Sequence, residues 1–163
     1  MFALIKNGVV VQIQPYEEAG FVAVPDGTCC GMVQNTDGSF SAPGPSLAQA
    51  QSSQITLLRS ACQSAITGGF TSSALGSAYN YPSDPTSQSN LNTVAGSPSG
   101  GSLWCESGGV WAMKAHTQAQ AQAVLASFVA WLNACQTQLA TLTGEVNAAT
   151  TVSAVQAITW TAP

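Results

Sequence analysis

A regular apolar seam in the last third of the chain constrains the fold more than any other feature of the sequence. Its members recur in alternating steps of three and four residues: Leu125, Phe128, Leu132, Cys135, Leu139, Leu142 and Val146. This spacing is the a/d pattern of heptads, and it keeps one stripe of a continuous α-helix apolar. We therefore predict one long helix over about residues 117–147, with a face that another element must cover.

An earlier segment offers one such cover. Ser46 is suited to cap a helix that runs to about Thr67, where Gly68-Gly69 ends it. Its apolar side is formed by Leu47, Ile55, Leu58, Cys62 and Ile66. The seam can pack on this helix as an antiparallel hairpin, or on copies of itself around a symmetry axis. The heptads alone are compatible with an internal hairpin, a dimer or a trimer.

The residues before position 43 have a different pattern. Asn7-Gly8 predicts a tight turn between two short strands within residues 2–14, and a third strand follows at residues 20–24. Residues 1–42 then form a small antiparallel β module. Its expected core is Phe2, Leu4, Val9, Val11, Ile13, Phe21, Val24 and Phe40. That core is too small for a module that stands alone.

Proline and glycine organise the remainder of the chain. Residues 43–45 read as a Pro-rich linker, and residues 46–163 as one domain. Residues 70–111 are expected to be rich in loops and to end in a β-hairpin that turns at residues 106–109. Thr151 can cap a short terminal helix over residues 152–158, which places Trp160 on the core. The predicted class is α+β, with two antiparallel helices bridged by the loop-rich hairpin region.

Charge is nearly absent from the chain. Its only cations are Lys6, Arg59 and Lys114, and the charged fraction is 6%, where about 25% is usual. Three scattered cations cannot neutralise a run of phosphates, so we expect no nucleic-acid partner. Apolar runs far shorter than about 20 residues predict no membrane insertion, and without a secretory signal we expect synthesis in a cytoplasm. A chain so poor in charge is expected to hide surface in a larger assembly.

Residues able to perform chemistry are few. The sequence contains no nucleophile elbow, phosphate-binding loop or zinc-protease motif. His116 is the sole histidine, and the five cysteines include no C-x-x-C pair. We therefore predict neither catalysis nor a metal or other cofactor, and we expect the thiols to be buried or inert.

Several short motifs follow one another after residue 68. In chain order they are G-F-x-S-x-A-L-G at Gly69 to Gly76, the tyrosines Tyr79 and Tyr81, Asp84 followed by Q-x-N-L at Gln88 to Leu91, the tryptophans Trp104 and Trp111, His116 before the long helix, and A-A-T-T-x-x-x-V-x-x-I-x-W at Ala148 to Trp160. Residues 46–160 thereby resemble a domain of uncharacterised function at the C-terminal end of tailed-bacteriophage tail-fibre and baseplate-associated proteins. In that pattern an aspartate usually stands where this chain has Ser87. Residues 24–43 also resemble the leaders of small phage tail proteins.

The resemblance implies a virion structural protein, a component of the tail fibre or baseplate that joins subunits and contacts the host surface. Other tail proteins, copies of the chain itself (a trimer favoured) and a host glycan are the partners it implies. The alternative is an assembly chaperone that helps fibres form and then leaves the particle.

Two groups of residues are the site candidates within these motifs. The first group combines large apolar faces with polar tips and consists of Tyr79, Tyr81, Trp104 and Trp111. Such side chains either connect loops to helices within one domain, or bind another protein or a sugar. Asp84, Gln88 and Asn90 are suited to hold the backbone of a loop-rich segment.

Overall fold

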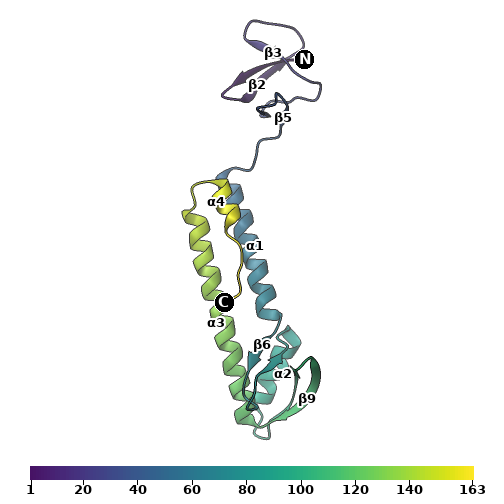
Figure 1. The fold of residues 1–163 in the computed structure, drawn as a ribbon, viewed down its shortest axis with the longest axis vertical. Helices are drawn as coiled ribbons and strands as arrows, with labels where there is room; N and C mark the ends of the chain where they lie inside the picture. The colour runs from purple at the N-terminus through teal and green to yellow at the C-terminus, as the bar shows by residue number, and fades with distance from the viewer. The chain divides into compact units, whose positions relative to one another are not determined.

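The computed structural model describes residues 1–163 and has the predicted α+β class, with four helices and two antiparallel sheets (Figure 1). The chain forms two compact units, Met1–Ser46 and Leu47–Pro163. We describe each unit by itself.

The first unit is a five-stranded antiparallel sheet. Its spatial order is β3-β1-β2-β4-β5, made from β1 (Phe2–Lys6), β2 (Val9–Gln14), β3 (Phe21–Ala23), β4 (Val33–Gln34) and β5 (Phe40–Ser41). β1 and β2 are joined by the predicted two-residue turn, in which Asn7 and Gly8 have φ values of 52° and 76°. Positive φ at both central residues matches the right-handed twist of the two strands, which is why asparagine and glycine occupy this turn.

The core predicted for this unit was partly wrong: Val24 is buried and Ile13 and Phe40 pack against the core, as predicted, but Val11 does not belong to it. The buried apolar residues are Ala3, Val10 and Val24, and Val11 is 46% exposed. The pairing of β1 with β2 is irregular: Leu4 lies opposite Gln12 and Ile5 opposite Val10, so Val11 is an extra residue. Such a bulge shifts the alternation of a strand by one residue, and it lets Val10 and Ile13 pack on the same core.

Two long helices dominate the second unit. α1 (Leu47–Thr67) and α3 (Gln118–Ala148) lie side by side (Figure 1). The later part of the predicted seam, Leu142 and Val146, packs with α1, whereas Phe128 packs on Phe70. The apolar stripe of α1, including Leu58, Cys62 and Ile66, is buried. All seven seam residues belong to the two hydrophobic clusters of this unit or pack against them. The seam therefore packs within one chain, with Phe128, Cys135, Leu142 and Val146 buried and Leu125, Leu132 and Leu139 partly buried.

Both ends of the helix pair are fixed by polar side chains. At the start of α3, Thr117 and Gln120 form a reciprocal capping box. At the other end, the Gln51 amide donates to the carbonyl of Val146 at 3.1 Å, and the buried Gln54 amide donates to that of Ile158 at 2.6 Å. These two glutamines attach α1 to the carbonyl groups at and beyond the end of α3, a role that their sequence pattern did not indicate.

The terminal helix follows the prediction. α4 (Val152–Ala157) begins after Thr151, whose hydroxyl accepts from the backbone N–H of Ala154. Val155 is fully buried, and Trp160 packs against both hydrophobic clusters of the unit. The chain end thus lies along the helix pair.

The segment between the helices is more ordered than predicted. It forms a second antiparallel sheet in the order β6-β7-β8-β9, with β6 (Phe70–Ser72), β7 (Tyr79–Tyr81), β8 (Gly101–Ser107) and β9 (Val110–His116). It also contains α2 (Pro85–Gly96), a helix that we had expected to be loop. The predicted hairpin is present and turns at Gly108-Gly109, where both φ values are positive. None of the four helices is both long and apolar enough to cross a bilayer.

Candidate functional site

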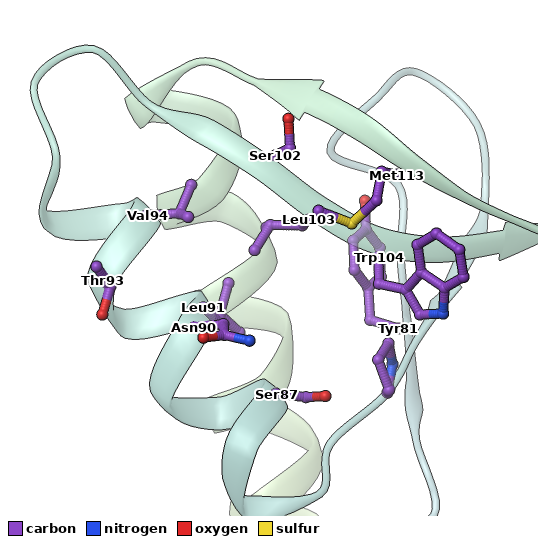
Figure 2. Close-up of a pocket in the computed structure, with 11 residues that line it drawn as sticks. Tyr81, Ser87, Asn90, Leu91, Thr93, Val94, Ser102, Leu103, Trp104 and Met113 are labelled. Atoms are coloured by element: carbon purple, nitrogen blue, oxygen red, sulfur yellow. The ribbon is translucent and has the colours of Figure 1, made fainter.

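A groove of about 310 Å³ lies between α2 and the β8–β9 hairpin (Figure 2). The buried side chains of Tyr81, Leu91 and Leu103 form its inner surface. Its rim is formed by exposed residues, with Trp104 and Met113 on the hairpin side and Asn90 on α2. The groove therefore has an apolar interior and a mixed rim, the arrangement typical of small-ligand sites.

Strand pairing places the two tryptophans of the hairpin on one face. Trp104 lies opposite Met113, and Glu106 lies opposite Trp111, so the two indoles are diagonal neighbours. They remain 47% and 46% exposed, and they line a second hollow beside the groove together with Pro82, Asp84 and Ser87. We call Trp104, Trp111 and Met113 the aromatic face.

The N-terminus of α2 is held by Asp84. One oxygen of this carboxylate accepts from the backbone N–H groups of Thr86 and Ser87, at 2.9 and 3.1 Å, and the other accepts from the Ser87 hydroxyl at 2.5 Å. These hydrogen bonds, that of the Ser87 hydroxyl foremost, hold the pKa of the Asp84 carboxyl below its usual value. Ser87 thus completes the cap of α2.

Ser83 connects this helix start to the rest of the fold. The Gln88 amide donates to the Ser83 carbonyl at 2.7 Å, as expected of a residue that holds the backbone. The buried Ser83 hydroxyl donates to the carbonyl of Ile66 at 2.5 Å and accepts from the N–H of Gly69 at 2.8 Å. The end of α1 and the start of α2 are therefore joined. Sequence reasoning missed Ser83, because a single serine in a serine-rich segment gives no distinguishing signal.

Asn90 does not have the role predicted for it. Its side chain is exposed at the groove and makes no hydrogen bond within the chain. Ser102 on the hairpin is also exposed and makes no hydrogen bond within the chain, but its hydroxyl points away from α2 (Figure 2). The groove consequently presents the Asn90 amide, whose donors and acceptor are unused.

The surroundings of the groove contain carboxylates and no cation. Asp84 lines the adjoining hollow, and Glu106 lies two residues from Trp104 on the same face of β8. The nearest lysine along the hairpin, Lys114, pairs with Leu103 on the other face and places its Nζ atom 5.3 Å from the centre of the Tyr79 ring. An anionic ligand would find no countercharge in this groove.

The structure separates the tyrosines from the tryptophans. Tyr81 is 3% exposed, and its hydroxyl lies 2.9 Å from Nε2 of the buried His116. The Lys114 carbonyl, 2.8 Å from Nδ1 of His116, can only accept, so Nδ1 carries a proton, and in the neutral imidazole Tyr81 then donates to Nε2. Tyr81 and His116 are thus a buried structural pair behind the groove. Tyr79 is half-buried beneath Lys114, which leaves Trp104 and Trp111 as the exposed members of the predicted set.

The cysteines lie away from the rim of the groove. Cys62, Cys105 and Cys135 are buried, and Cys29 and Cys30 are exposed in the first unit. Burial raises the pKa of the three interior thiols, which disfavours the reactive thiolate. The site as built is suited to binding, through two indoles and a small number of neutral polar groups.

Comparison with known protein families finds one match. The model of a family described as "Domain of unknown function (DUF4376)" matches residues 49–159. Comparison with curated proteins and with solved structures gives no match.

Proposed function

The chain belongs to the family described as "Domain of unknown function (DUF4376)", and we propose that it is a structural protein of a bacteriophage tail, a component of the fibre or baseplate. In this proposal it is made in the host cytoplasm and becomes part of the virion. The motifs from Gly69 to Trp160, which resemble those of tail-fibre and baseplate-associated proteins, support this assignment.

The observation that carries the proposal is the aromatic face. Trp104, Trp111 and Met113 are between 46% and 58% exposed although the domain beneath them has a complete core. A free protein with a charged fraction of 6% gains little solubility from its surface, so exposed indoles favour a chain that works while bound. Aromatic side chains of this kind are enriched where binding energy concentrates.

The first unit supports a permanent place in an assembly. Its buried apolar side chains are Ala3, Val10 and Val24. So small a core supplies little stability by itself, and contact with another tail protein would add to it. We propose that Met1–Ser46 attaches the chain to the tail, and that Leu47–Pro163 presents the aromatic face.

Self-association is part of the proposal, with a trimer favoured. Because most of the seam of α3 packs within the chain, copies of the chain would meet through exposed apolar residues such as Leu57 and Val129, which are 62% and 44% exposed. Light scattering on the purified chain tests this point. A monomer at all accessible concentrations would contradict it.

Mass spectrometry of purified virions tests the main proposal. We expect this chain in gradient-purified particles at a constant ratio to the other tail proteins. A non-virion assembly chaperone, the alternative function, would be absent from particles while its loss still prevents fibre formation. A chain that is absent and also dispensable for tail assembly would contradict both functions.

A further inference from the structure

We propose that the groove between α2 and the β8–β9 hairpin binds a neutral saccharide, with a sugar ring against Trp104 and hydrogen bonds to the Asn90 amide. This inference deepens the proposed function, because it rests on a tail protein that presents the groove to the host surface. It concerns one ligand class and one set of side chains.

The indoles provide the first argument. Trp131 is partly buried and uses its Nε1–H in a 3.2 Å hydrogen bond to the Ala65 carbonyl. Trp104 and Trp111 are exposed instead, and their Nε1–H groups make no hydrogen bond within the chain. The negative face of an indole attracts the polarised C–H groups on one side of a pyranose ring. Each indole can therefore stack on a sugar and still donate one hydrogen bond.

The unpartnered polar groups provide the second argument. Figure 2 shows Asn90 and Ser87 on α2 across the groove from Trp104 on the hairpin, whereas the Ser102 hydroxyl points away from α2. The Asn90 amide offers two donors and an acceptor. Ser87 donates to Asp84 and keeps its acceptor sites. Sugar hydroxyls both donate and accept, so they match this mixture.

Charge selects among saccharides. Asp84 and Glu106 lie beside the aromatic face, and no lysine or arginine lines the groove or the adjoining hollow. Carboxylates accept hydrogen bonds from neutral hydroxyls, but they repel sialic acids, uronic acids and phosphorylated sugars. The proposed ligand is therefore an uncharged hexose or N-acetylhexosamine within a surface polysaccharide.

The matched residue Asn92 makes the test specific. Asn90 and Asn92 are both exposed residues of α2 without a hydrogen bond in the chain, but only Asn90 lines the groove. We expect the full-length chain to bind neutral glycans and no anionic ones on a glycan array, and titration calorimetry with the best array glycan then compares variants. Asn90→Ala and Trp104→Ala should each weaken binding about tenfold or more, as expected for loss of a ligand hydrogen bond or a stacking platform. Asn92→Ala should bind as the parent does.

Each other outcome overturns the inference. Binding that survives Trp104→Ala and Asn90→Ala places the glycan elsewhere, and a preference for anionic glycans contradicts the charge argument. If no neutral glycan binds while virions contain the chain, the saccharide inference fails and the structural proposal stands. Protection of Trp104 and Trp111 from oxidative labelling in the virion, without glycan binding, would assign the face to another tail protein.

Discussion

The buried hydrogen bond between Tyr81 and His116 leads to a quantitative prediction. Tyr81→Phe removes only the hydroxyl group. The ring keeps its contacts with Phe70 and His116, whose ring centroids lie 5.7 Å and 5.8 Å away. His116 is 3% exposed, so its Nε2 acceptor would remain buried without a donor. Leaving such a group unsatisfied costs about 1–3 kcal/mol of unfolding free energy. We expect Tyr81→Phe to be destabilised by that amount.

Urea unfolding followed by tryptophan fluorescence measures this change. All four tryptophans lie in Leu47–Pro163, so the signal reports on the unit that contains the pair. Tyr79→Phe is the matched control, since the Tyr79 hydroxyl makes no hydrogen bond within the chain, and we expect it to change stability by less than about 0.5 kcal/mol. In a double-mutant cycle, Tyr81→Phe combined with His116→Leu should cost less than the sum of the single changes. Equal stability of Tyr81→Phe and Tyr79→Phe would refute the reasoning.

Alkaline titration gives an independent readout of the same residue. Burial, with smaller contributions from Cys105 and Tyr79, raises the pKa of Tyr81 from 10.0 to about 12. Between these values the unfolded chain loses the phenolic proton before the folded chain does, so stability falls as the pH rises through this window. Tyr81→Phe should therefore lose stability less steeply between pH 10 and 12. An unchanged slope would show that Tyr81 ionises like an exposed tyrosine.

Three further predictions concern other parts of the chain. The lowered pKa of Asp84 contributes stability that is present above the ordinary carboxyl pKa and is lost as the pH falls through the pKa of the folded state. The urea midpoint of Asp84→Asn should therefore fall less steeply at acid pH than that of the parent chain. Parallel plots of midpoint against pH would contradict this. Leu58→Ala should cost about 2–5 kcal/mol in urea unfolding, because Leu58 is 1% exposed and packs against the seam of α3, and a smaller loss would mean that the helix pair repacks around the truncated residue. A thiol reagent followed by mass spectrometry should label Cys29 and Cys30 in the native chain and the buried thiols only after denaturation, whereas early labelling of a third thiol would indicate local opening of the core.

The helix pair was predictable because its signal is long. The seam extends from Leu125 to Val146, and a stripe of that length is consistent with one helix and no strand. What the seam faces was not predictable, because a heptad pattern is equally satisfied by a neighbour within the chain and by a second copy. The choice depends on whether the residues between the two helices allow α3 to pack beside α1. The hydrogen bond from the Ser83 hydroxyl to the Ile66 carbonyl is one contact that fixes this intervening segment against the end of α1.

α2 was missed although its start signal is present. Asp84-Pro85 combines an N-cap residue with the residue favoured at the first helical position, and Leu91, Val94 and Ala95 have helical spacing. The segment is rich in serine and asparagine, which favour turns and loops over helix interiors. Tertiary contacts outweigh that preference, since Leu91 and Ala95 are both 5% exposed in the core next to α3.

The candidate site shows the same division between local and distant information. Alternation along a strand correctly places Tyr79 with Tyr81, and Trp104 with Glu106, on shared faces, but it does not say which face will be buried. That depends on α3, whose Phe128 ring lies 5.3 Å from the ring of Phe70 and covers the face that contains Tyr81. Once α3 occupies that side, the aromatic face must point outward, and the charged side chains beside it are the carboxylates Asp84 and Glu106. The scarcity of cations in this sequence therefore acts locally, because it leaves indoles, an amide and two carboxylates as the groups that a partner of this domain meets.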